Sequence, residues 1–143
     1  MQHDAIAVIG VACRLPQSPD PDSFWHLLRS GRSAISDAPS DRRDTGYGGN
    51  GSSPGGTGTR AGGFLDRVDL FDAGFFNVSP REAAAMDPQQ RLMLELNWEA
   101  IEDSGIVPER LQGSRTAVVV GAIWDGYATM TYDRAGQRCA RTP

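Results

Sequence analysis

The longest helical pattern in the sequence is Asp87-Pro-Gln-Gln-Arg-Leu-Met-Leu-Glu-Leu-Asn-Trp-Glu-Ala-Ile-Glu-Asp-Ser-Gly105. Asp87 is a good N-cap residue, Pro88 fits the first helical position, and Gly105 is a typical helix terminator. A single polar stripe recurs every three or four residues along the pattern, at Arg91, Glu95, Glu99 and Glu102. Apolar residues occupy most of the other positions, so the helix is predicted to be surrounded by protein on most sides, with its carboxylates on a solvated stripe.

Two further helix starts precede this pattern. Asp20-Pro21 with Ser23 predicts a short amphipathic helix that ends at Gly31. Ser79-Pro-Arg-Glu82 is a capping box, in which the Ser hydroxyl and the Glu carboxylate each accept from an amide at the helix start. Three helices are therefore expected, each starting at a proline.

Two apolar runs rich in β-branched residues lie outside the helices, at residues 5–11 and 116–121. Such runs are typical of strands that are covered on both faces. The order strand, helix, helix, strand predicts an α/β fold with parallel strands. Two strands are too few for a complete sheet, so much of the core is expected to come from residues outside this chain.

The remaining segments predict less regular structure. Nine of the chain's 17 glycines fall within residues 46–63, which predicts a flexible loop and no phosphate-binding loop, because the chain has no lysine. Residues 63–76 carry four phenylalanines without a clean period, and irregular structure held by aromatic contacts is expected. Residues 131–143 are Arg-rich, lack helix caps and are predicted to form a disordered tail.

Composition excludes several classes of function. The chain of 143 residues has 14 basic residues, all arginine, against 18 acidic ones, for a net charge of −4. Scattered basic residues argue against nucleic acid and anionic membranes as partners. The longest apolar run, residues 5–13, is far shorter than the roughly 20 residues that span a bilayer. A cytoplasmic protein with one domain, or part of one, is expected.

No catalytic or metal-binding constellation is visible. Cys13 and Cys139 lie at opposite ends without a CxxC pattern, which indicates neither a disulfide framework nor a metal site. His3 and His26 have no acidic or thiol partner at catalytic spacing. We therefore expect no metal and assign no general base.

Several motifs together identify a family. In chain order these are Ile6-Ala-Val-Ile-Gly-Val-Ala-Cys-Arg-Leu-Pro16, Phe24-Trp-His-Leu-Leu-Arg-Ser-Gly31, Gly62-Gly-Phe-Leu65, Phe71-Asp-Ala-Gly-Phe-Phe76, Ser79-Pro-Arg-Glu-Ala83, and Met86-Asp-Pro-Gln-Gln-Arg-Leu92 with Trp98-Glu-Ala100. With them the chain resembles the N-terminal portion of a β-ketoacyl synthase (ketosynthase) domain of a modular type I polyketide synthase. The Met86 motif is the most specific of the set.

The resemblance implies a thiolase-like fold of layered α/β/α/β/α type, incomplete in this chain. The family-like part is expected to cover residues 1–130, followed by a non-family tail at 131–143. The implied parent is a homodimer that performs a decarboxylative Claisen condensation of acyl and malonyl-type thioesters carried on an acyl carrier protein. No cofactor is expected on this chain, because the phosphopantetheine belongs to the carrier protein.

The family's nucleophilic cysteine and its two catalytic histidines match no residue here, so no catalytic residue is assigned and the chain alone is expected to be inactive. Three alternatives stay open. The chain could be a non-catalytic interaction fragment that pairs with a complementary ketosynthase segment. It could belong to a loading-module ketosynthase that only decarboxylates, which the run from Gly121 to Ala128 resembles. It could also be a small enzyme that uses Cys13.

One functional segment carries over from the resemblance. In the family, the turn after the strand that corresponds to residues 116–121 lies near the acyl pocket and the dimer interface. Ile123 and Trp124 are therefore the candidate substrate-binding residues. The alternative, that they only pack against other parts of the domain, is left open.

Overall fold

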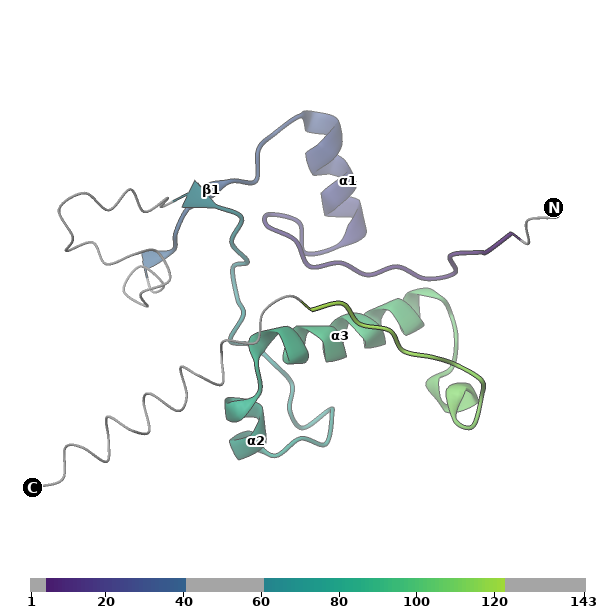
Figure 1. Ribbon diagram of the computed structural model, residues 1–143. Helices are drawn as coiled ribbons and strands as arrows, with labels where there is room; N and C mark the ends of the chain where they lie inside the picture. Colours follow the sequence, from purple (N-terminus) through teal and green to yellow (C-terminus); the bar gives the residue numbers. More distant parts are fainter. Residues whose placement is uncertain (1–4, 41–60, 123–143) are drawn as a thin grey trace, which may run out of the picture. The chain divides into compact units, whose positions relative to one another are not determined.

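The computed structural model describes residues 5–40 and 61–122. These residues form, in order, α1 (Pro21–Ser30), β1 (Ser36–Asp37), β2 (Ala61–Gly62), α2 (Pro80–Ala85), α3 (Pro88–Asp103) and a short 3-10 helix, η2 (Pro108–Leu111) (Figure 1). The chain divides into two compact units, one made of Met1–Val11 with Val68–Pro143 and the other of Ala12–Arg67. The predicted tail at 131–143, and most of the predicted loop at 46–63, lie outside the described residues.

The helix α1 begins and ends where its caps predict. The Asp20 carboxylate accepts a hydrogen bond from the Ser23 amide at 2.7 Å, and Pro21 stands at the first helical position. Gly31 ends the helix with φ of 63°, a left-handed conformation that glycine adopts without steric cost. Its amide donates to the Leu28 carbonyl at 3.1 Å.

Both predicted helix starts in the second half of the chain are confirmed. Ser79 caps α2, and its hydroxyl accepts from the Glu82 amide at 3.2 Å. Asp87 caps α3, and its carboxylate accepts from the Gln89 amide at 2.8 Å. The helix α3 ends two residues before Gly105, which has φ of 68°. These ends follow the sequence closely because each depends only on residues within one turn.

The two predicted parallel strands do not form among the described residues. Residues 5–11 and 116–121 have no strand structure, and the one sheet consists of β1 and β2, paired antiparallel with Ser36 opposite Gly62 and Asp37 opposite Ala61. The expectation of a parallel sheet is therefore wrong for this part of the chain. A strand needs a neighbour for its amides and carbonyls, and the described residues supply none for these two runs. The strand β2 also replaces the last part of the predicted 46–63 loop.

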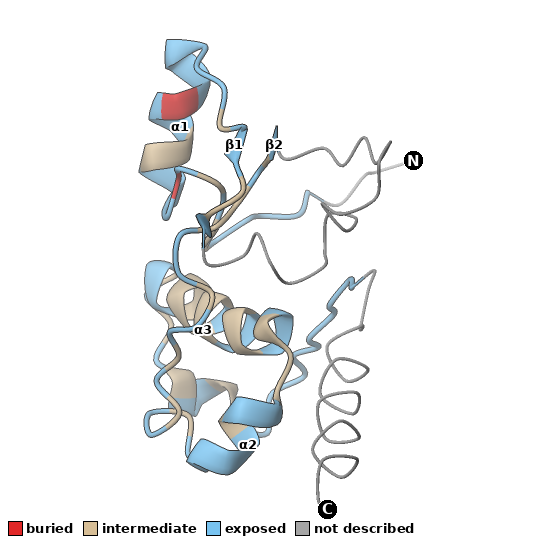
Figure 2. Ribbon diagram, turned by 90° about the vertical axis from the view of Figure 1, so that its left-hand side faces the viewer, coloured by how far each residue is buried: buried red, intermediate tan, exposed pale blue. Residues whose placement is uncertain are grey.

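Burial is low throughout the described residues (Figure 2). Leu27 of α1, 7% exposed, is the one buried hydrophobic side chain among them, and no residue of α3 is buried. The prediction that α3 is surrounded by protein on most sides is thus wrong here. Arg91, Glu95 and Glu99 of the expected solvated stripe are half-buried, while the apolar Met93 is exposed. A helix that is apolar on most faces cannot cover all of them against so few neighbours.

Candidate functional site

The predicted substrate-binding residues Ile123 and Trp124 lie just beyond the described residues, so their role stays a prediction. The segment that leads to them is described up to residue 122. Its valines face solvent, and Val119 is 91% exposed. This segment has no strand partner among the described residues. Residues 116–122 are therefore an apolar stretch without a strand partner among the residues that the structure describes.

The other predicted strand has the same character. Ile6 is 95% exposed, and Val8 and Ile9 are also exposed. Together with residues 116–122 this gives one unit two apolar segments, both rich in β-branched side chains, that are largely exposed among the described residues. Residues of this kind are usually buried in finished domains. We call these two runs, residues 5–9 and 116–122, the open segments.

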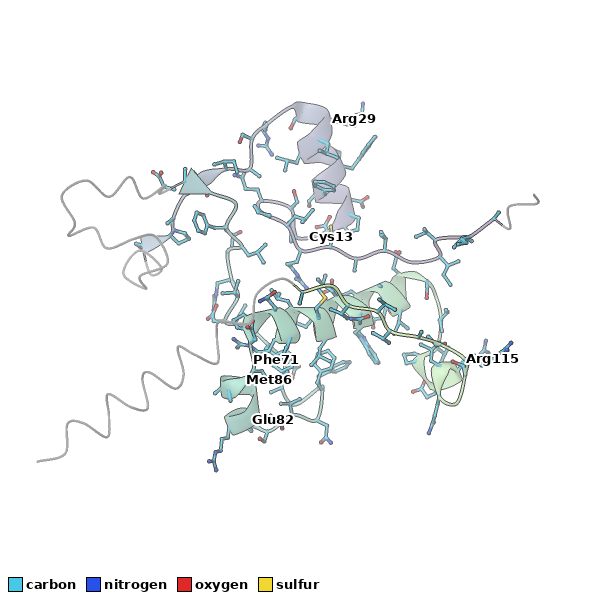
Figure 3. All side chains as sticks on the ribbon, in the orientation of Figure 1. Cys13, Arg29, Phe71, Glu82, Met86 and Arg115 are labelled. Atoms are coloured by element: carbon cyan, nitrogen blue, oxygen red, sulfur yellow. The ribbon has the colours of Figure 1, made fainter. Side chains whose placement is uncertain are left out.

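The family-specific Met86-Asp-Pro-Gln-Gln-Arg-Leu92 block is structural in this chain. Asp87 caps α3 through its side chain, and its carbonyl accepts from the Gln90 amide at 2.9 Å. Met86 joins α2 to α3, and its amide donates to the Glu82 carbonyl at 3.0 Å (Figure 3). The buried Nε of Arg91 has no hydrogen-bond partner among the described residues. The block thus sets the junction of two helices and places no catalytic pair.

An aromatic cluster contacts α3 at Trp98. The rings of Phe71 and Phe76 are stacked with centroids 5.3 Å apart, and Phe75 meets Phe76 edge to face at 5.0 Å. Phe75 also meets Trp98 of α3 edge to face at 4.8 Å. Edge-to-face and offset pairs at these distances are the favourable arrangements for aromatic rings. The expectation of irregular structure held by aromatic contacts in residues 63–76 is confirmed for residues 71–76.

Asp72 fixes the backbone of this cluster. Its carboxylate accepts a hydrogen bond from the Phe75 amide at 2.9 Å, and the Val78 amide donates to the Ala73 carbonyl at 2.8 Å. Asn77 takes a positive φ of 53°, a conformation that Asn tolerates better than most residues. These local bonds turn the chain tightly enough to bring Phe71 and Phe76 onto each other.

Cys13, the nucleophile of the small-enzyme alternative, does not stand in a catalytic arrangement in the described residues. Cys13 is a half-buried thiol in irregular chain (Figure 3), without the strand-to-helix elbow that exposes a nucleophile. His26 is exposed on α1. Hydrogen bonds from the Ser23 amide and hydroxyl are the main causes of a lowered pKa at Asp20, and His26 contributes the smallest effect. These contacts serve helix capping.

Neither a metal centre nor a membrane span is found in the part of the chain that the structure describes. Within residues 5–40 and 61–122, no group of three or more His, Cys, Asp or Glu side chains could hold a metal ion. None of the helices in these same ranges is long and apolar enough to cross a membrane.

Most of the chain matches solved structures of one class of domain. The structure resembles an oxazolomycin ketosynthase domain of Streptomyces albus, with a TM-score of 0.79 and 36% identity over 91% of this chain and 23% of that one. It also resembles the ketosynthase from module 6 of the bacillaene synthase of Bacillus subtilis, with a TM-score of 0.76 and 33% identity over 89% of this chain and 21% of that one. The fold is the N-terminal part of a thiolase-like ketosynthase fold.

Sequence comparison leads to the same class. The chain matches the family "Beta-ketoacyl synthase, N-terminal domain" over residues 3–142. It is 53% identical over 135 residues to the polyketide synthase GfsA of Streptomyces halstedii, and 47% identical over 134 residues to the spectinabilin polyketide synthase system protein NorC of Streptomyces orinoci. These matches cover 94% and 91% of this chain but only 2% and 6% of the relatives. The chain belongs to the β-ketoacyl synthase N-terminal domain family.

Proposed function

We propose that this chain is the N-terminal part of a polyketide synthase ketosynthase domain that forms carbon–carbon bonds by decarboxylative Claisen condensation. The match to the β-ketoacyl synthase N-terminal domain over residues 3–142 carries this proposal. The substrates are an acyl chain and a malonyl-type unit, both as thioesters on an acyl carrier protein. The complete domain acts as a homodimer in the cytoplasm.

The role of this part in the complete domain is to supply layers of the fold. The nucleophile and the decarboxylating histidines come from residues that have no match in this chain. The open segments support the division of roles, because exposed β-branched residues such as Val119 and Ile6 suit strands that further residues would cover. Ile123 and Trp124, which follow one open segment, are proposed to line the acyl pocket.

A polypeptide of these 143 residues alone is proposed to be inactive. Condensation needs a thiolate, a base and oxyanion donors held in one geometry, and Cys13 has no such elbow around it. The test incubates the chain with an acyl thioester and malonyl-loaded acyl carrier protein and follows the masses of both the chain and the carrier by mass spectrometry. Neither an acyl adduct nor loss of carbon dioxide is expected. Turnover that disappears in Cys13→Ala would overturn the proposal and favour a small independent enzyme.

Complementation tests the proposal that the chain forms part of a condensing domain. The chain is mixed with a segment that supplies the remaining residues of a ketosynthase domain from a close relative, and product formation is measured. Condensation is expected in the mixture and in neither part alone. If the supplied segment carries the nucleophilic cysteine and the mixture still decarboxylates without condensing, the chain would instead be assigned to the loading type. Stable pairing without any chemistry would favour the interaction fragment, for which the exposed side chains of the open segments are the supporting observation.

A further inference from the structure

Asp103 makes a contact that joins two distant parts of the sequence. The Val11 amide donates a hydrogen bond to Oδ2 of Asp103 at 2.8 Å, across 92 positions of the chain. Both residues belong to the same compact unit. A carboxylate acceptor makes such a bond roughly twice as strong as a neutral one. The bond therefore ties the start of the chain to the end of α3.

The neighbouring glycine allows the close approach that this bond requires. A Cβ atom at Gly10 would collide with the carbonyl oxygen of Ala100 and would lie 2.9 Å from Cβ of Ser104. The carbonyl of Ala100 is held in place, because it already accepts from the Ser104 amide at 3.1 Å. The backbone at Gly10 therefore lies directly on the last turn of α3, where only a residue without a side chain fits.

The contact offsets an unfavourable charge at this end of α3. Glu102 and Asp103 both stand in the last turn, which holds no basic residue, and negative charge is unfavourable at a helix C-terminus. Asp103 offsets this by accepting from the Val11 amide. Glu102 is exposed, which makes it a natural control for the charge alone.

We infer that Asp103 is a positioning residue that, together with Gly10, fixes the N-terminal open segment on the last turn of α3. The bond holds the chain at residues 10 and 11, while Ile6, Val8 and Ile9 remain exposed next to this anchor. The anchor sets where this apolar run begins relative to α3 before any further strand pairs with it. The inference holds whether or not the complete protein carries out condensation.

Amide hydrogen exchange of the 143-residue chain, read by NMR at Val11, tests the inference. Asp103→Ala should speed exchange at Val11 at least about tenfold, because the amide loses its carboxylate acceptor. The Val11 amide proton should also shift upfield. Asp103→Asn keeps an acceptor oxygen and should retain part of the protection, whereas Glu102→Gln should change nothing. Exchange at Leu96 within α3 serves as the reference for global unfolding.

The second variant is Gly10→Ala, and Gly121→Ala is its control. Gly10→Ala should release the Val11 amide although Asp103 is intact, and Gly121→Ala, with no atoms within 4 Å of the added Cβ, should not. Lost protection at Leu96 in Asp103→Ala would mean that the whole unit unfolds. In that case the comparison of Gly10→Ala with Gly121→Ala tests whether the close approach at residue 10 protects the Val11 amide. Equal exchange at Val11 and Ile9 in the unaltered chain, or no change in Asp103→Ala and Gly10→Ala, would overturn the inference.

Discussion

Single side chains at the helix starts account for most of the local structure. Asp20, Ser79 and Asp87 each precede a proline, and each accepts a hydrogen bond from an amide two or three residues further on. These bonds satisfy donors that the first turn of a helix leaves without partners. The chemistry is local, so the effects of substitution at these positions can be stated directly.

Asp20 should make α1 sensitive to acid. Hydrogen bonds from Ser23 hold the pKa of Asp20 below its ordinary value of 3.8, and the nearby His26 adds a smaller effect. Because the pKa of the folded state is lowered, the stabilisation is present above the unfolded pKa and is lost as the pH falls through the folded one. An NMR titration of the Ser23 amide should give a midpoint below 3.8.

Two variants separate the cap from the charge at this site. Asp20→Asn keeps an acceptor oxygen, so α1 should persist and the titration at Ser23 should vanish. Asp22→Asn removes a carboxylate from the same turn without touching the cap, and the titration should remain. A midpoint at Ser23 that is unchanged in Asp20→Asn would assign the titration to another group.

Substitutions at Gly31 measure the free-energy cost of a left-handed backbone conformation. Its φ is 63°, and a Cβ added there would meet nothing within 4 Å. Gly31→Ala should therefore destabilise α1 by about 1 kcal/mol through backbone strain alone. Gly31→Asn should cost less, because Asn tolerates this conformation. Urea denaturation followed by circular dichroism measures both, and equal stability of all three chains would contradict the assignment.

Among the elements, α3 and the aromatic turn form the best-connected pair. Phe75 contacts both Phe76 and Trp98, so it joins the irregular stretch to the helix. Aromatic pairs of this geometry contribute about 0.5–1.5 kcal/mol beyond the area that they bury. Residues 63–76 have no regular hydrophobic periodicity, so this contact, and no regular apolar face, attaches them to the helix.

Trp98→Ala should destabilise this unit by about 2 kcal/mol. The value lies below the roughly 3–5 kcal/mol of fully buried aromatic residues, because Trp98 is half-buried. Trp25→Ala is the matched control, since Trp25 is 58% exposed on α1, and it should cost less than about 0.5 kcal/mol. Chemical denaturation followed by circular dichroism compares them. Equal losses would show that the Phe75 contact contributes little.

At the scale of the whole molecule, the described residues have much exposed apolar surface and little core. Leu27 is buried, whereas Val119 and the other residues of the open segments are exposed. The chain covers about a quarter or less of the solved ketosynthase domains that it matches. Burial of the open segments is therefore expected only when further residues of such a domain are present.

Because Val119 is exposed in the chain alone, Val119→Ala should affect stability less there than in the complemented domain. Val119→Ala should change the stability of the chain alone by less than about 0.5 kcal/mol, because its side chain is exposed. Leu27→Ala, the buried control, should cost about 2–3 kcal/mol. After complementation by the remaining ketosynthase residues, Val119→Ala should cost about 1–2 kcal/mol. Thermal unfolding of both states tests this, and an unchanged effect of Val119→Ala would show that the segment stays uncovered.

Local sequence was enough to predict the helix boundaries, the aromatic turn and the family. Capping residues such as Asp87 act on amides within one turn, so their effect is readable without the rest of the molecule. The motif around Met86 identified the family by residue identity, although its role in the structure is to join two helices.

Whether the two apolar runs form strands depends instead on tertiary contacts. Their sequences predict buried strands, but a strand forms only where a neighbour pairs with it, and no described residue does so. The bond from Val11 to Asp103, and the close approach of Gly10 to α3, likewise left no local signal, because the partners are 92 positions apart. Contacts of that range depend on the path of the whole chain, which local side-chain preferences do not specify.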